Sequence, residues 1–459
     1  MLRAATTDLT AWIKRPERRP LVLRGARQVG KTWLVRDLAA RSGRELIEIN
    51  FERDPRWAAC FADNDPAKTL QKIGLRLGRQ VAVDRSLLFL DEIQEFGEGL
   101  AKLRWFAEEC PALPVVAAGS LLEFTLRDHD FSMPVGRVSF YNLEPMTFAE
   151  YLTAHGQDLL LEAIRAFSPR DAADDFIHDQ TLRWFDRYSL CGGMPGIVAH
   201  DVANPQGDTT GIIREAQRQL LATYRADFMK YTRRADPQLI GTVLASVAAQ
   251  MGSKFILKQA HDARPALVKP AVELLCQARL CTSIAYSAGN GVPLGAETKE
   301  KFRKIGLLDV GLLQALMETP DLLSEIGELN PTMRSRVAEQ LVTQMLRANG
   351  PRSGDPTSLY YWQREGGRPG EIDHLVQHQS RVIPIELKSG AAGSMKSLHQ
   401  FVADKGLNLA VRIDRNPPSL QEMDVRTTQG DQARYRLVNL PIYLLGELDR
   451  VLSLASIGE

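Results

Sequence analysis

Two stretches of the sequence carry residues whose types and spacing suit phosphate chemistry, and the first is GARQVGKT at residues 25–32. It satisfies the pattern G-x-x-x-x-G-K-[ST], follows an apolar segment and precedes a helix-forming one. The glycines let backbone N–H groups face phosphate oxygens, and the N-terminus of the helix adds a partial positive charge. The lysine of this pattern contacts the β- and γ-phosphates, and the threonine hydroxyl binds Mg²⁺. We therefore expect ATP and Mg²⁺ to be bound by the loop residues Gly25, Ala26, Arg27, Gln28, Val29, Gly30, Lys31 and Thr32.

An apolar segment that ends in two acids, SLLFLDE at residues 86–92, supplies the second half of a hydrolytic site. Asp91 is placed to hold Mg²⁺ through water, and Glu92 is placed to orient or deprotonate the attacking water. Many strands end in acids, so this segment alone indicates little. Together with Lys31 of the loop, Asp91 and Glu92 predict that the nucleotide is hydrolysed as well as bound.

Two further polar residues of this region have two interpretations each. Ser120 ends the apolar segment LPVVAAGS, where it either senses the γ-phosphate or is a simple turn residue. Arg137 either supplies a cation to the transition state or to a neighbouring subunit's nucleotide, or is a solvated surface arginine. The sequence leaves both alternatives open for each residue.

The second stretch is GEIDHLVQHQSRVIPIELKSG at residues 370–390, which has the pattern of a two-stranded hairpin. With QHQS as a four-residue loop, Val376 lies opposite Arg381 and the side chains alternate from there. That register places the aliphatic side chains on one face, and a slip by one residue would expose them and scatter the charges. The polar face carries Asp373, Glu386 and Lys388.

Two carboxylates at this separation can share a divalent cation with a scissile phosphate, and a lysine can position the water or stabilise the developing charge. An E-x-K string alone arises by chance, so the prediction depends on Asp373, on the hairpin and on Glu339, an acid of the preceding helix. The expected metal ligands are Asp373, Glu386 and Glu339, and the expected catalytic residues are Asp373, Glu386 and Lys388. Gln400, farther on, is either a substrate contact or a surface glutamine.

The elements that position these residues follow from the pattern of the chain. Residues 1–155 contain short β-branched segments that alternate with helical ones, which predicts parallel strands joined by helices in a P-loop ATPase core. Residues 156–234 are mainly helical and are interrupted by the turn CGGMPG, so we expect a helical lid. Residues 235–329 hold three helix-like segments and a hairpin, which fit either a winged helix or a plain helical bundle. Residues 330–459 begin with an amphipathic helix and continue into strands, which predicts a final α/β domain.

Length and composition limit the class of protein. At 459 residues the chain is too long for one compact core and predicts several domains. With 44% hydrophobic residues, 25% charged residues and a net charge of +1, it has the composition of an ordinary soluble globular protein, so any nucleic-acid surface must be a local patch. We expect a cytoplasmic protein without a membrane-spanning segment, because neither a signal peptide nor a long apolar run is present. The five cysteines lack C-x-x-C pairing and predict reduced structural thiols.

Several motifs occur in a fixed order along nearly the whole chain: GARQVGKT, LLFLDEIQ, the VGR before LEPMTFAEYL, CGGMPG, KFRKIGLLDVGLL, EIDHLV and IELKSG. In this order they resemble a large family of bacterial and archaeal AAA-type ATPases whose C-terminal region is a domain of unknown function. The resemblance implies an ATPase core related to the origin-recognition branch, a winged-helix segment and a C-terminal fold similar to PD-(D/E)XK nucleases. It implies no particular substrate.

The sequence therefore predicts an ATP-driven switch or motor attached to a DNA-facing C-terminal half. Nucleotide binding and hydrolysis would reposition the lid and the winged helix, and thereby control access to the site around Asp373. Two classes of function stay open. One is an ATPase that also cleaves nucleic acid in genome defence or repair, and the other is an ATPase whose last domain only recognises DNA or protein. DNA is expected as the partner in preference to RNA, and both a monomer and a homo-oligomer are compatible with the sequence.

Overall fold

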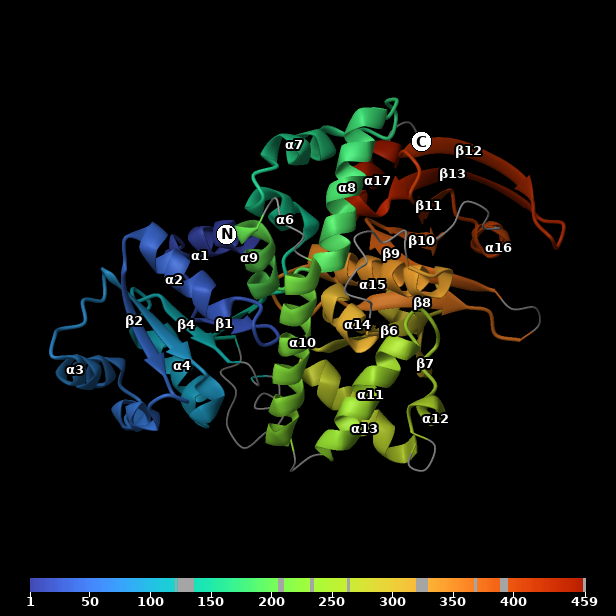
Figure 1. The fold of residues 1–459 in the computed structure, drawn as a ribbon. Helices are drawn as coiled ribbons and strands as arrows, with labels where there is room; N and C mark the ends of the chain where they lie inside the picture. The colour runs from blue at the N-terminus through green and yellow to red at the C-terminus, as the bar shows by residue number, and fades with distance from the viewer. Residues whose placement is uncertain are drawn as a thin grey trace. The chain divides into compact units, whose positions relative to one another are not determined.

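The structure is a computed structural model, and it describes residues 1–119, 122, 136–204, 210–231, 235–261, 265–318, 329–366, 370–388 and 395–456. The chain forms two compact units (Figure 1). The N-terminal unit consists of Met1–Pro145, Gln277–Leu280 and Gly350–Thr357. The C-terminal unit consists of Met146–Cys276, Cys281–Asn349 and Ser358–Glu459. Two short segments from the second half of the chain thus belong to the N-terminal unit. No helix in the described part of the chain combines the length and the apolar character that a membrane crossing requires.

The N-terminal unit is built on a five-stranded sheet in which every pair of neighbours is parallel, in the order β2-β3-β4-β1-β5. The alternation of strands and helices in the sequence is the cause, because parallel neighbours need a crossover connection. The strands are β1 (Leu21–Arg24), β2 (Glu45–Asn50), β3 (Ser86–Asp91), β4 (Val115–Ala118) and β5 (Ser139–Asn142). The helices are α1 (Ala4–Ile13), α2 (Lys31–Ser42), η1 (Pro55–Phe61), α3 (Pro66–Leu77), η2 (Ile93–Glu95) and α4 (Gly99–Glu109). The parallel α/β core that the sequence predicts for this region is confirmed.

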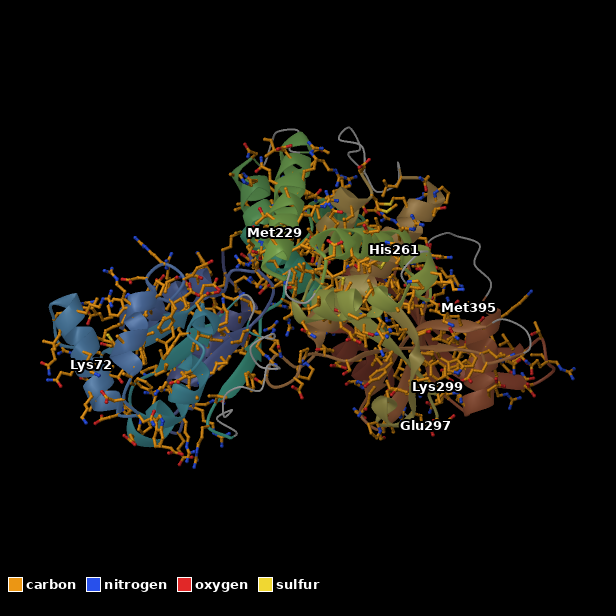
Figure 2. All side chains as sticks on the ribbon, turned by 90° about the horizontal axis from the view of Figure 1, so that it is seen from below. Lys72, Met229, His261, Glu297, Lys299 and Met395 are labelled. Carbon is orange, nitrogen blue, oxygen red and sulfur yellow. The ribbon has the colours of Figure 1, made fainter. Side chains whose placement is uncertain are left out.

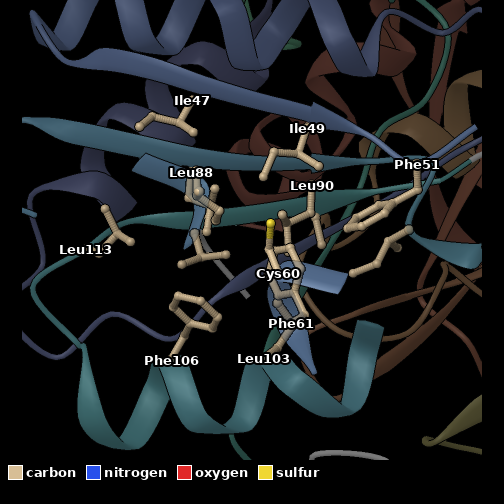
Figure 3. Packing of buried hydrophobic residues seen from close by; sticks show 14 of the residues in the cluster. Ile47, Ile49, Phe51, Cys60, Phe61, Leu88, Leu90, Leu103, Phe106 and Leu113 are labelled. Carbon is tan, nitrogen blue, oxygen red and sulfur yellow. The ribbon is translucent and has the colours of Figure 1, made fainter. Parts of the chain in front are cut away.

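One face of this sheet is covered by a continuous apolar cluster, part of which Figure 3 shows between the strands and a helix. Strand β3 is buried along its whole length. Leu88 and Leu90 of β3 belong to the cluster together with Leu103 and Phe106 of α4. Burial of each such side chain contributes roughly 1.5–3 kcal/mol relative to exposure. This packing fixes the end of β3, where the acid Asp91 is located.

The edge strand β5 of this sheet is extended by the returning segment Gly350–Thr357. Tyr141 and Ser353 form an antiparallel bridge. The backbone N–H of Asn142 donates to the carbonyl of Arg352 at 2.6 Å, and the N–H of Gly354 donates to the carbonyl of Phe140 at 3.2 Å. The segment therefore satisfies backbone groups that an open sheet edge would leave unpaired.

The C-terminal unit begins with a helical region that contains α8 and α10, two long helices (Figure 1). The turn CGGMPG separates α8 from α9, and Gly192 within it has φ of 79°, which favours glycine. The helices are α6 (Phe148–Ala154), α7 (Asp158–Ala166), α8 (Asp175–Cys191), α9 (Pro195–Ala203), α10 (Thr210–Asp227), η3 (Phe228–Tyr231), α11 (Pro237–Ala249), α12 (Leu257–Ala260) and α13 (Pro265–Gln277).

The rest of this unit is organised by a mixed eight-stranded sheet in the order β12-β13-β11-β10-β9-β8-β6-β7. The strands are β6 (Cys281–Ser287), β7 (Thr298–Leu307), β8 (Leu359–Gln363), β9 (Glu371–His378), β10 (Arg381–Leu387), β11 (Leu409–Asp414), β12 (Ser419–Arg426) and β13 (Gln432–Pro441). The helices are η4 (Leu294–Glu297), α14 (Val310–Leu316), α15 (Pro331–Asn349), α16 (Lys396–Lys405), η6 (Ile442–Glu447) and α17 (Leu448–Ser456).

The hairpin of β6 and β7, which the winged-helix interpretation treats as a wing, lies within this sheet. Strand β6 pairs in parallel with β8, so the hairpin forms one end of the eight-stranded sheet. Ile284 and Tyr286 of β6 are buried, whereas a free-standing wing would leave such side chains in water. The boundary expected between residues 329 and 330 therefore does not separate two compact units.

Candidate functional site

The loop at residues 25–30 connects β1 to α2, and its backbone geometry requires its glycines. A Cβ at Gly25 would lie 2.5 Å from the carbonyl oxygen of Leu143. Gly30 has φ of 94° at the N-cap of α2. Gln28 has φ of 64°, a conformation that is strained for a residue with a Cβ and is enriched at functional sites. These backbone conformations let the loop turn sharply into α2, so the N–H groups of the loop lie next to those of the first turn of the helix.

Lys31 is buried within this loop. Its Nζ donates to the carbonyl oxygens of Gly25 and Ala26, each at 2.8 Å. Burial lowers the pKa of Lys31 to about 8, although the nearby carboxylates of Glu92 and Asp91 act in the opposite direction. The ammonium is thus held by carbonyls of the loop and lies within electrostatic range of the two acids.

Asp91 and Thr32 are adjacent in the structure, as the sequence predicts. The Thr32 hydroxyl donates to Oδ2 of Asp91 at 3.3 Å, and the amide of Asn50 donates to the same oxygen at 3.3 Å. Burial, and next the carboxylate of Glu92, raise the pKa of Asp91. A hydroxyl and a carboxylate that converge in this way are the oxygen ligands that Mg²⁺ prefers, so the residues fit this ion. Sequence reasoning missed Asn50, whose position at the end of the neighbouring strand was the available signal.

Glu92 follows directly after β3 with φ of 49°. Its Oε2 accepts a hydrogen bond of 2.6 Å from the side-chain amide of Gln94. A Cβ at Gly119 would collide with Oε1 of the same amide, so the end of β4 also shapes this contact. Gln94 lies in the motif LLFLDEIQ, but the pattern of that motif alone assigns it no role. The structure identifies it as a residue that positions the Glu92 carboxylate.

Ser120 and Arg137 each have two interpretations from the sequence, and the structure describes only Arg137. Ser120 lies outside the described residues. Arg137 forms an ion pair with Glu108 at 2.8 Å, and 54% of its side chain is exposed. Within its own chain it therefore pairs with an acid and is about half exposed, and a role at the transition state stays a prediction. Contact with a neighbouring subunit's nucleotide stays a prediction.

Residues 17–152 match the family of the AAA domain. This region is an AAA-type P-loop ATPase domain. The match and the geometry of Lys31, Thr32 and Asp91 both support binding and hydrolysis of ATP by the ATPase domain. Two domains of unknown function match farther on, DUF8612 at residues 182–323 and DUF4143 at residues 334–438. No curated protein matches the chain.

Two solved structures show distant similarity to this chain. The Walker-type ATPase PABY2304 of Pyrococcus abyssi aligns at 15% identity over 68% of this chain and 94% of its own, with a TM-score of 0.41. The ORC2 protein of Aeropyrum pernix aligns at 13% identity over 69% of this chain and 93% of its own, with a TM-score of 0.35. With TM-scores below 0.5, these alignments do not establish a shared overall fold.

The second candidate site is the hairpin of β9 and β10 in the C-terminal unit. Its loop has two residues and not four, because Arg381 pairs with His378 and Ile383 with Val376. The predicted register was therefore wrong by two residues, a shift that leaves every side chain on its face because the side-chain period is two. Continuation of the observed register places Asp373 directly opposite Glu386.

Asp373 and Glu386, the two acids of the hairpin, both accept hydrogen bonds within the chain. Oδ2 of Asp373 accepts a hydrogen bond of 2.8 Å from the backbone N–H of Leu387, and Oε1 of Glu386 accepts one of 2.6 Å from Lys388. Burial raises the pKa of Glu386 to about 7, with the carboxylate of Asp373 as the next cause. Glu339 of α15 lies in the same cluster, and burial and Asp373 raise its pKa to about 8.

A buried lysine that the sequence analysis did not single out completes this cluster. The side chain of Lys304, on β7, is 2% exposed. Its Nζ forms an ion pair with Glu371 and lies 3.8 Å from Oδ1 of Asp373. Burial lowers the pKa of Lys304, but the carboxylates of Glu339, Asp373 and Glu371 outweigh that effect and raise it above its usual value. The available signals were the motifs KFRKIGLLDVGLL and EIDHLV, which contain Lys304 and Glu371.

The fit of a divalent cation to this cluster is poor. Among the described residues, no group of three or more His, Cys, Asp and Glu side chains is arranged to hold a metal ion. The ammonium of Lys304 lies beside the carboxylates that the sequence analysis proposed as ligands. Gln400 is buried, and its amide donates to Asp404 at 2.7 Å and to Asp431 at 2.9 Å, so its interpretation as a surface glutamine was wrong. A contact with substrate stays a prediction.

Proposed function

We propose that this protein is an ATP-dependent switch in which the nucleotide state of the ATPase domain changes how the C-terminal unit engages a partner. Lys31 would hold the β- and γ-phosphates, and Glu92, oriented by Gln94, would accept a proton from the attacking water. Mg²⁺, held by Thr32 and through water by Asp91, would neutralise charge on the phosphates.

The proposed coupling between the nucleotide and the C-terminal unit rests on a set of contacts that join the phosphate loop to the segment Gln277–Leu280. One guanidinium nitrogen of Arg3 donates to the carbonyl of Val29 at 2.9 Å, and the other donates to the carbonyl of Glu144 at 2.7 Å. The side chain of Glu144 in turn binds Arg279 at 2.8 Å. Arg279 belongs to Gln277–Leu280, which connects α13 to β6. A change in the loop on nucleotide binding therefore acts on residues that continue directly into the C-terminal unit.

The partner that we propose for the C-terminal unit is DNA. The order α15-β8-β9-β10-α16-β11 supports the resemblance to nuclease-like folds. The alternative is a protein partner bound by the same unit. The DNA and protein alternatives are distinguished by measuring how the wild type binds a labelled DNA duplex, once with ATP and once with ADP. If the duplex binds in neither nucleotide state, the DNA proposal is contradicted.

The catalytic assignment is tested by three substitutions in the full-length protein. We expect Lys31→Ala to abolish nucleotide binding, because no other described residue places an ammonium in the loop. Glu92→Gln should retain ATP and lower turnover by about 100-fold or more, since it removes the general base. Glu95→Gln is the matched control, because Glu95 is an exposed acid three residues away. Normal turnover by Glu92→Gln would show that the water-activating carboxylate is misassigned.

The coupling is tested by hydrogen exchange in Glu92→Gln with and without ATP. We expect ATP to slow the exchange of backbone amides at residues 277–280, in addition to the loop itself. Protection that stops at the loop would contradict the switch while leaving the ATPase intact.

A further inference from the structure

The carboxylate cluster of the C-terminal unit is balanced by two lysines from the same unit. Its acids are Glu339, Glu371, Asp373 and Glu386, and its bases are Lys304 and Lys388. Lys388 pairs with Glu386 at 16% side-chain exposure, at the border of the cluster. Lys304 is the buried one, and it reaches the cluster from β7.

An ammonium and a divalent cation compete for such a position. Both are bound by carboxylate oxygens, and two positive charges at the same point repel strongly in a poorly solvated site. The Lys304 ammonium forms ion pairs with Glu371 and Asp373, and the carboxylate of Glu339 also stabilises its positive charge. These are the acids that a metal would need, apart from Glu386.

We propose that Lys304 is a built-in cation that takes the place of a divalent metal, so that the cluster is a closed ion network and not a metal-dependent nuclease site. The proposal is independent of the ATP-dependent switch, because it concerns only residues of the C-terminal unit. Through this one lysine, β7 is tied to the acids of β9 and, electrostatically, to Glu339 of α15. The C-terminal unit then engages its partner without cutting it.

One oxygen of the cluster remains available for a metal when the lysine is removed. Oε2 of Glu386 has no hydrogen-bond partner among the described residues, and Glu386 is 7% exposed. Neutralisation of Lys304 would leave the carboxylates of Asp373 and Glu371 without their shared cation, and Glu386 lies opposite Asp373 in the hairpin. We therefore expect Lys304→Met to create a divalent-cation site that the wild type lacks.

The test is Mn²⁺ binding by calorimetry in the nucleotide-free, full-length protein. We expect Lys304→Met to bind Mn²⁺ about tenfold or more tightly than the wild type, because ligand charge sets the affinity of oxygen sites. Lys304→Arg, which keeps the charge, should behave as the wild type. The matched control is Lys299→Met on the same strand, because Lys299, labelled in Figure 2, is half-exposed. It pairs with Glu365, which is also partly exposed. This control variant should leave Mn²⁺ binding unchanged.

The site is localised by Glu386→Gln in the Lys304→Met background, which should remove the gained binding. A folded Lys304→Met protein that gains no Mn²⁺ affinity would overturn the proposal. Should that variant not fold, the wild type and Glu386→Gln are compared by thermal melting with and without Mn²⁺. The proposal requires that Mn²⁺ shifts both melting temperatures by the same amount, because both proteins keep the divalent-cation ligands of the ATPase domain. A larger shift in the wild type that Glu386→Gln abolishes would overturn it. ATP turnover in the wild type is unaffected by either result, so failure here is distinguishable from failure of the switch.

Discussion

Asp309 explains why two distant motifs of the chain occur together. It lies in LLDVGLL, is fully buried, and accepts hydrogen bonds from the N–H of Gly193 at 2.7 Å and of Gly311 at 2.8 Å. The amide of Gln344 donates to it at 3.1 Å. A Cβ at Gly192 would collide with its carboxylate. The glycines of CGGMPG and the aspartate that caps α14 are therefore two halves of one contact, which the sequence displayed as separate motifs.

We expect Asp309→Ala to destabilise the C-terminal unit by about 3–5 kcal/mol, because it leaves buried N–H groups without an acceptor. Asp309→Asn should cost less, since one carbonyl oxygen remains to accept. The control is Asp171→Ala at an exposed position, which should stay within about 0.5 kcal/mol of the wild type. The measurement is chemical unfolding followed by circular dichroism. An Asp309→Ala protein as stable as the control would show that this network does not hold the turn.

In the hairpin of β9 and β10, the sequence pattern predicts which face each side chain lies on, but it does not predict which other strands contribute side chains to that face. Alternation fixed the faces of Asp373 and Glu386, and an error of two residues in the loop left both on one face. The alternation within the hairpin does not reveal Lys304, because this lysine lies on β7, and β6 and β8 separate β7 from β9 in the sheet. Pairing of β6 with β8 is a long-range contact, so neither the sheet's full width nor its internal cation follows from local spacing.

Asn142 lies on β5 and binds both returning segments. The residue as a whole is 4% exposed. Its Oδ1 accepts from Arg279 at 2.9 Å, and its Nδ2 donates to the carbonyl of Gly354 at 3.0 Å. We expect Asn142→Ala to destabilise the N-terminal unit by about 2–4 kcal/mol, since several buried groups lose their partner at once. It should also raise the KM for ATP while leaving kcat nearly unchanged, because Asn142 touches no reacting atom.

The control for Asn142→Ala is Ser139→Ala at the other end of β5, a position that is partly exposed. Steady-state ATPase kinetics and thermal melting are measured on both variants. A fall in kcat at unchanged KM would assign Asn142 a part in the chemical step and would contradict a role in positioning.

At the scale of the whole molecule, the sequence predicted the parallel α/β core at residues 1–155 but not that this core is completed by later residues. Gln277–Leu280 and Gly350–Thr357 carry no motif, and they are recognised only by what they contact. Arg352 forms an ion pair with Asp8, with 3.2 Å between Nη1 and Oδ2. Arg279 forms one with Glu144, with 2.8 Å between Nη2 and Oε1. Hydropathy and spacing report the elements of a chain, whereas such returns depend on the complete tertiary structure.

A fragment of residues 1–155 should therefore be a poorer ATPase domain than the same residues within the full chain. It keeps the loop from Gly25 to Thr32, but it lacks Arg279 beside Glu144 and leaves the edge of β5 unpaired. We expect the fragment to bind a fluorescent ATP analogue about tenfold more weakly, which corresponds to roughly 1.4 kcal/mol, and to aggregate at lower temperature. Full-length Asn142→Ala should fall between the fragment and the wild type, because it loses the side-chain contacts but keeps the segments covalently close. If the fragment binds as tightly as the full chain and melts as a stable domain, the returning segments contribute nothing to the nucleotide site, and the proposed route from Val29 through Glu144 to Arg279 loses its physical basis.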